Sequence, residues 1–208
     1  MHRLIIYLLI IVCVVFSGCS GLLPEKSYDK ASEKLLKLRT YTCDVEMKVT
    51  NNRSTLEYRM KHSYMSPDKY RIEVLEPMEL RGQVTIHNSK GSYIYHPRIN
   101  QYLITQNFSS SLEHGAFIGS FIDHMRNKEK VKVSREEDGG RVFFVLEFEL
   151  SKPNRYRSME KIWIDAEDIV PIKAEIYGEG GEKTVSVYYS NFVYNTKLDE
   201  RDFEIPEN

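Results

Sequence analysis

The sequence is poor in cysteine, with three in 208 residues. Cys13 lies inside an apolar run and Cys19 follows that run, so Cys43 is the single cysteine in the remainder of the chain. This distribution excludes an internal disulfide in the body of the protein. Cys43 falls on the apolar side of an alternating pattern, which favours a small buried side chain over a reactive thiol.

The sequence also has almost no net charge. The chain has 29 Lys and Arg against 30 Asp and Glu, a formal charge of -1 at pH 7, and the charges are interleaved with apolar residues. A nucleic-acid surface needs a basic stripe, so we expect no nucleic-acid partner. Because 41% of the residues are hydrophobic, we expect one domain with a substantial core rather than tandem small domains.

Motifs of catalysis and metal binding are missing. The six histidines do not stand in the His-Glu-x-x-His or Cys/His spacings of zinc sites, and we expect His114 and His124 to be exposed polar residues of a helix. Ser109–Ser111 lacks the Gly-x-Ser-x-Gly frame of a nucleophile, and a hairpin between two strands explains Gly178–Gly181. We therefore expect no enzyme activity, no metal and no cofactor.

Residues 1–18 are predicted to be a signal peptide. A weakly basic start precedes the apolar run Leu4–Phe16, which is shorter than the about 20 apolar residues that span a membrane comfortably. Ser17-Gly18-Cys19 then resembles the lipobox of bacterial lipoproteins, in which the cysteine is acylated and becomes the mature N-terminus. The alternatives are a retained anchor helix or an ordinary signal peptide that is cut nearby.

Acylation of Cys19 defines the expected location of the protein. Residues 19–26 would be a lipidated polar tether, and the body from residue 27 would stand at the extracytoplasmic face of a bacterial membrane. More than one acyl chain makes such anchoring stable, since each buried CH₂ contributes about 0.8 kcal/mol.

Alternation of apolar and polar residues predicts strands through most of residues 27–208. A hairpin joins 43–49 to 56–60 across Asn51 and Asn52, and turn signals at 66–69, 88–91 and 97–100 divide the stretch to residue 105 into four strands. Later strands are predicted over 130–135, 142–150, 161–165, 170–177 and 184–192. Short turns join consecutive strands, which is typical of antiparallel pairing. We therefore expect a meander, with the remaining strands added at its edges.

Two helices are predicted among these strands. Tyr28, Ala31, Leu35 and Leu38 recur at helical spacing, and a second helical pattern runs from Leu112 to Met125. A sheet of roughly ten antiparallel strands is wider than open flat sheets usually are, so it should curl. The expected fold is mainly β: a strongly curved antiparallel sheet that forms an incomplete β-barrel, with two helices on its concave side.

Several phrases of the mature chain resemble the LolA/LolB superfamily of lipoprotein carriers. The matching phrases are Ser66–Glu73, Ser92–Pro97 with Asn100–Tyr102, Ile162–Asp165 with Pro171, and Tyr189–Phe192 followed by Asn195, Leu198, Phe203 and Pro206. The resemblance implies an incomplete barrel closed by helices around an apolar cavity, and it implies that the protein is not an enzyme. The fold inferred from periodicity agrees with it.

Within that superfamily, a lipid-anchored chain rich in Lys, Glu, Tyr and Asn is similar to the GerS-type spore germination lipoproteins of clostridia. This likeness implies a membrane-tethered binding protein whose partner is an envelope protein, in particular an N-acetylmuramoyl-L-alanine amidase that modifies the spore cortex. The alternative is a carrier or receptor for lipoprotein acyl chains or other hydrophobic ligands, like LolA and LolB.

The aromatic excess suggests candidate lining for a ligand cavity. Phe117, Phe121, Tyr95 and Trp163 are the candidates for an apolar cavity inside the half-barrel. Aromatic residues on strands are more often plain core, which is the alternative for each of them.

We predict that Cys19→Ala leaves the body folded but releases it from the membrane or blocks its processing. The expected core residues all lie beyond the tether, so none of them depends on the lipid. Thermal melting tests folding, and membrane fractionation tests anchoring. A correctly cleaved Ala variant that still sediments with membranes would show that the body itself is the anchor.

Overall fold

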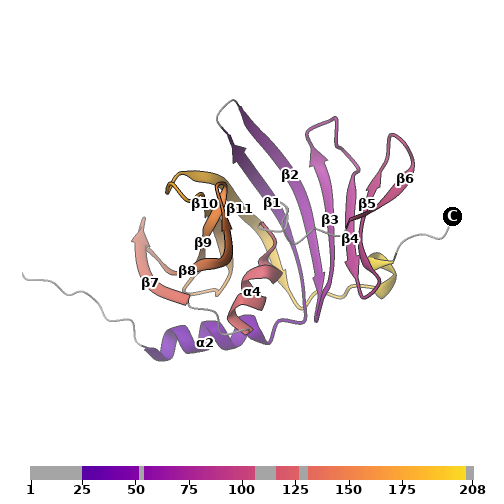
Figure 1. The fold of residues 1–208 in the computed structure, drawn as a ribbon. Coiled ribbons are helices and arrows are strands. Elements are labelled where there is room, and N and C mark those ends of the chain that lie inside the picture. Colours follow the sequence, from indigo (N-terminus) through magenta and orange to yellow (C-terminus); the bar gives the residue numbers. More distant parts are fainter. Residues whose placement is uncertain (1–24, 52–53, 106–115, 127–130, 205–208) are drawn as a thin grey trace, which may run out of the picture.

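The computed structural model describes residues 25–51, 54–105, 116–126 and 131–204. These residues form eleven strands, two α-helices and one short 3₁₀ helix (Figure 1). The strands are β1 (Thr40–Thr50), β2 (Thr55–Met65), β3 (Lys69–Glu76), β4 (Val84–Asn88), β5 (Gly91–His96), β6 (Gln101–Thr105), β7 (Val131–Asp138), β8 (Arg141–Asn154), β9 (Arg157–Asp165), β10 (Pro171–Tyr177) and β11 (Lys183–Tyr194). The helices are α2 (Glu25–Leu36), α4 (Ile118–Arg126) and the 3₁₀ helix η2 (Glu200–Phe203).

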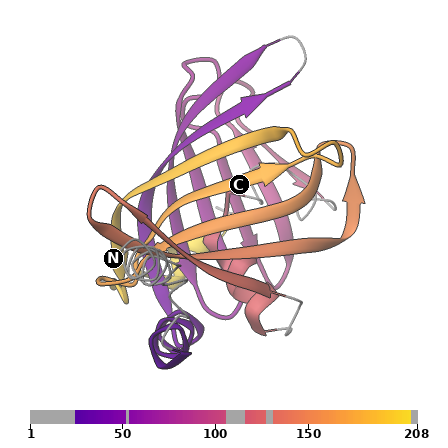
Figure 2. The same ribbon diagram turned by 90° about the vertical axis from the view of Figure 1, so that its left-hand side faces the viewer.

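All eleven strands belong to one antiparallel sheet with the order β6-β5-β4-β3-β2-β1-β11-β10-β9-β8-β7. Two meanders, β1 to β6 and β7 to β11, are joined where the first strand pairs with the last. The sheet curves strongly and stays open, because β6 and β7 are its two ends (Figure 2). The predicted incomplete barrel of antiparallel strands is confirmed.

Alternation along the strands separates an inner, concave face from an outer, convex face. On β1, Cys43, Val45 and Met47 are buried in the core, whereas Asp44 and Glu46 between them point outward. Successive side chains of a strand point to opposite faces, so this sequence pattern fixes which face is covered. The prediction that Cys43 is a buried residue is confirmed, and burial raises the pKa of its thiol.

Both helices contribute apolar residues to the core that the sheet encloses. Helix α4 lies in the hollow of the sheet with Ile118, Phe121 and Ile122 buried, and α2 crosses the lower end of the hollow with Ala31 and Leu35 buried (Figure 1). The prediction of two helices is confirmed. The second helix begins at residue 118 in the described part of the chain, and residues 112–115 of the predicted span lie outside it.

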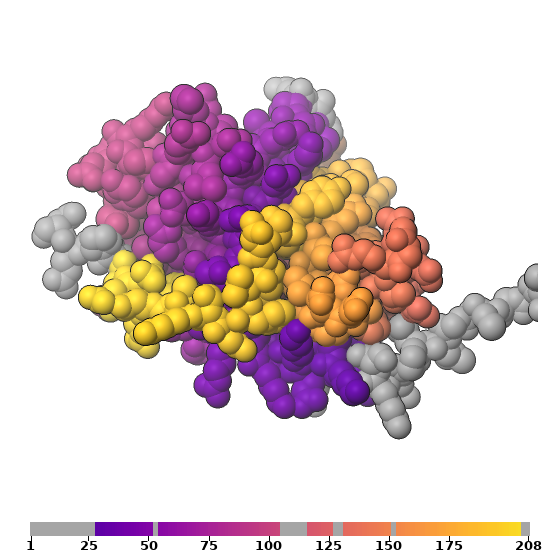
Figure 3. Space-filling model, turned by 180° about the vertical axis from the view of Figure 1, so that it is seen from behind, coloured from indigo at the N-terminus to yellow at the C-terminus, as the bar shows by residue number. Residues whose placement is uncertain are grey.

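The C-terminal segment docks on the outer face of the first meander (Figure 3). Phe203 at the end of η2 is 1% exposed, and the Asn88 side chain donates a 2.8 Å hydrogen bond to its carbonyl oxygen. A capping box of Asp199 and Asp202 starts this helix, and Lys69 forms a 3.0 Å ion pair with Glu200. The 3₁₀ helix η2 therefore covers part of the outer face at β3 and β4.

We predict that Ile72→Ala lowers the free energy of unfolding by about 2–5 kcal/mol, because it leaves a cavity in the core. Ile72 is 1% exposed, whereas Leu56 on the neighbouring strand is 49% exposed. Leu56→Ala is the matched control and should change stability by less than about 0.5 kcal/mol. Urea unfolding of both variants measures the difference, and equal losses would contradict the assignment of the core.

Candidate binding surface and buried polar groups

Phe117 and Phe121 are packed in the core, against the inner, concave face of the sheet. The ring centroid of Phe117 is 4.6 Å from that of Tyr70 and 5.7 Å from that of Tyr64. Phe121 meets Phe148 edge to face at 5.8 Å. Both candidates of the predicted cavity therefore lie on the concave side, where they contact other aromatic residues of the sheet.

Trp163 and Tyr95 do not join that group. Trp163 alternates with Ile162 and Ile164, which face the core, so its indole lies on the outer face, where its N–H donates a 2.7 Å hydrogen bond to Glu136. The Tyr95 hydroxyl donates to the side-chain oxygen of Asn100 at 3.0 Å. The structure thus does not bring the four proposed cavity residues together. Cys19 lies outside the described residues, and its acylation stays a prediction.

His62 is a fully buried polar residue on the inner face. It stands opposite Cys43 on β1 and Ile72 on β3, and its ring centroid is 6.3 Å from that of Phe117. Its exposure is 0%, and neither ring nitrogen has a hydrogen-bond partner among the described residues. Burial lowers its pKa to about 3, so the ring is neutral at physiological pH.

A buried ion pair lies beneath α4. Glu160 is 0% exposed, and Arg157 donates to its Oε1 from Nε at 2.6 Å and from Nη2 at 2.5 Å. The Nε2 of His124 is 3.8 Å from the other carboxylate oxygen of Glu160, and its ring lies 5.4 Å from that of Phe148. With a side chain only 19% exposed, His124 is not the exposed polar residue that the sequence suggested. His114 lies outside the described residues.

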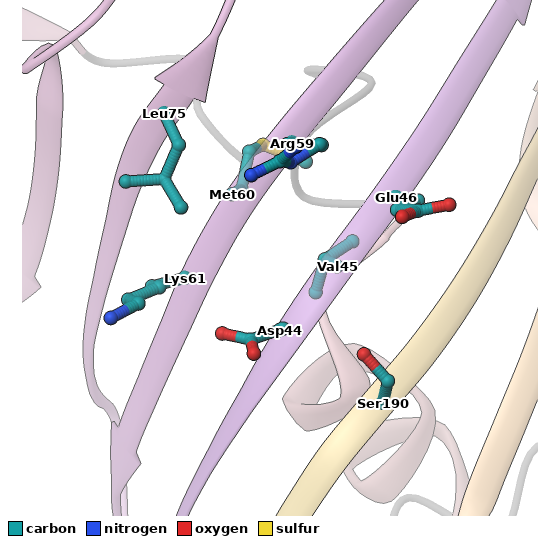
Figure 4. A pocket seen from close by; sticks show the side chains of 8 residues that line it. All are labelled: Asp44, Val45, Glu46, Arg59, Met60, Lys61, Leu75 and Ser190. Carbon is teal, nitrogen blue, oxygen red and sulfur yellow. The ribbon is translucent and has the colours of Figure 1, made fainter.

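The outer face of β11, β1, β2 and β3 carries a groove of about 410 Å³ (Figure 4). Its lining residues are Asp44, Val45, Glu46, Arg59, Met60, Lys61, Leu75 and Ser190. The pairing of β1 with β2 places Asp44 opposite Lys61 and Glu46 opposite Arg59. One wall of the groove is therefore acidic and the other basic.

Neighbouring groups hold some of these charges in place. Asn191 donates a 2.7 Å hydrogen bond to Asp44, and Arg59 lies 3.3 Å from Glu76. A second groove of about 180 Å³ continues along the same face past Lys48 and Glu57. Fixed charges of both signs on an open sheet face suit contact with a polar protein surface. We call this surface, defined by the lining residues of the two grooves, the outer groove.

The described part of the chain shows no cluster of three or more His, Cys, Asp or Glu residues that could hold a metal ion. Within residues 25–51, 54–105, 116–126 and 131–204, no helix is both long and apolar enough to cross a membrane.

The fold defines a class of proteins. The structure is similar to that of a conserved protein from Thermus thermophilus, with a TM-score of 0.58 and 14% identity over 88% of this chain and 94% of that chain. A LolA superfamily protein from Nitrosomonas europaea matches with a TM-score of 0.50 and 14% identity over 89% of this chain and 99% of that one. The chain therefore has a LolA-like fold, as its sequence phrases suggested.

The structure of the GerS lipoprotein in complex with the CwlD amidase, from Clostridioides difficile, is also similar. Its TM-score is 0.52, with 24% identity over 86% of this chain and 99% of that chain. A search of curated proteins found no match. The family model described as sporulation protein YdcC-like matches residues 1–203, so the chain belongs to the YdcC-like sporulation protein family.

We predict that the buried His62 makes stability fall as the pH falls. Between pH 6.5, its ordinary pKa, and about pH 3, the unfolded chain binds a proton at His62 that the folded chain does not. Going from pH 7 to pH 5 should therefore remove about 2 kcal/mol of unfolding free energy.

Urea unfolding at both pH values tests this for the native chain and for His62→Leu, which should lose much of the pH dependence. His87→Gln is the control, because it replaces a half-buried histidine and leaves His62 in place. If the slope with pH is the same in His62→Leu and in the native chain, His62 is not the titrating group.

Proposed function

We propose that this chain is a membrane-anchored, non-catalytic envelope lipoprotein that binds a cortex-modifying amidase needed for spore germination. The observation that carries the proposal is the likeness to GerS, whose structure was solved in complex with an amidase. Membership of a sporulation protein family supports the same cellular setting.

The predicted lipobox supports the anchoring part of the proposal. Acylation at Cys19 would hold the body at the extracytoplasmic face of the membrane. The first described helix, α2, begins at Glu25, six positions after Cys19 in the sequence, so an acylated Cys19 would hold this helix near the membrane surface. A protein held in this way meets envelope enzymes by diffusion in the plane of the membrane.

The outer groove is the surface that we assign to the amidase. Its charged side chains Glu46, Arg59 and Lys61 are exposed, and the groove spans four neighbouring strands. The rows of charge that face each other across it set an orientation for a partner with matching charges. A carrier of acyl chains would instead need an opening on the concave side. There, Phe117 and Phe121 are packed against aromatic residues of the sheet.

Affinity purification from sporulating cells tests the proposal, with the tagged full-length chain as bait. We expect an N-acetylmuramoyl-L-alanine amidase to be enriched, as measured by quantitative mass spectrometry. The matched bait is Arg59→Glu with Lys61→Glu, which reverses the basic wall of the outer groove at two exposed positions. We expect it to recover at least about tenfold less amidase, the effect of about 1.4 kcal/mol in binding.

The two baits separate the parts of the proposal. Absence of any amidase from the native bait would contradict the function. Equal recovery by both baits would support the function but would show that the amidase binds another surface. Equal thermal melting of the two baits confirms that the charge reversal leaves the fold intact.

A further inference from the structure

The two ends of the sheet differ sharply in charge. Of the eight residues of β7, five are charged: Lys132, Arg135, Glu136, Glu137 and Asp138. The five residues of β6, Gln101–Thr105, include no charged residue. Charged side chains on an edge strand oppose the addition of another strand. The charges of β7 therefore protect its edge against strand pairing, whereas the described residues of β6 supply no such charge.

Apolar side chains are exposed on both faces of β6. Leu103 is 50% exposed and Ile104 is 74% exposed. These two residues are adjacent, so their side chains point to opposite faces of the sheet. A helix or loop that packs on one face would cover only one of them. A strand added in the plane of the sheet lies beside both.

We propose that two copies of this chain pair antiparallel through β6, about a twofold axis at Leu103. In this register Leu103 stands opposite Leu103 of the second copy, and Tyr102 stands opposite Ile104. Pairs of aromatic and β-branched residues are favourable across strands. Because the strand has no charge, the symmetry places no like charges opposite each other, as it would for a strand like β7.

The composition of β6 selects a second copy over a charged partner strand. A charged strand would set its charges beside Leu103 and Ile104, where β6 has no charge to pair with them. The chain itself supplies an uncharged strand with apolar side chains on both faces. A pair of five-residue strands buries less surface than a standard stable interface, so we expect a reversible dimer. The test therefore traps it covalently.

Disulfide trapping in the full-length chain tests the register. Leu103→Cys places two thiols on directly opposite residues, whose Cα atoms lie about 4.5–5.5 Å apart in an antiparallel pair, within the range of a disulfide. Leu56→Cys is the matched control, since Leu56 is also a leucine and is 49% exposed. Ile104→Cys tests the register, because its thiols would be diagonal neighbours about 7–8 Å apart, too far to bridge.

After mild oxidation of membranes, non-reducing gels measure the fraction of disulfide-linked dimer. We expect at least about fivefold more dimer for Leu103→Cys than for Leu56→Cys or Ile104→Cys. Fivefold corresponds to about 1 kcal/mol in the free energy of association. The native chain gives the background from its own cysteines. No dimer from Leu103→Cys, or equal dimer from all three variants, would overturn the proposal. Both results leave the proposed amidase binding untouched.

Discussion

The pairing of β1 with β11 is the constraint on which the rest of the structure depends. Each meander is held by short hairpins, but only this pairing joins the two into one sheet. Two further hydrogen bonds strengthen it where β1 begins. The Asn195 backbone N–H donates to the Thr40 carbonyl oxygen at 2.7 Å, and the Thr40 side-chain hydroxyl donates to the Thr196 carbonyl oxygen at 2.7 Å. In the strand order β1 is the middle strand, paired with β2 on one side and β11 on the other, and the two meanders curve away from it around α4 (Figure 1).

The same central strand creates both the core and the outer groove. Its alternation sends Cys43, Val45 and Met47 inward and Asp44 and Glu46 outward, so a one-residue slip of the register would bury the carboxylates and expose the apolar side chains. Core packing therefore fixes the register, and the register fixes which charges face each other across the groove. The acidic and basic walls are a consequence of how the interior packs.

Local patterns in the sequence predict most strands, because a period of two depends only on neighbouring residues. The pairing of β1 with β11 could not be predicted in this way, since it joins opposite ends of the chain. Trp163 shows a second limit: its aromatic character suggested a cavity, although its alternation with Ile162 and Ile164 places it outside. His62 and Glu160 occupy core positions of such patterns, but their polarity hides this until the structure shows them buried.

The two kinds of ion pair in the structure have different consequences. Arg157 and Glu160 are buried together, so removal of Arg157 would leave the carboxylate of Glu160 buried without its guanidinium partner. Lys48–Glu57 and Arg59–Glu76 are solvent-exposed pairs, which contribute little to stability because water screens them. The outer charges are thus not needed to hold the sheet together. Electrostatic complementarity acts mainly on specificity and association rate. The exposed charges along the groove therefore affect the orientation of a bound partner more than they affect folding.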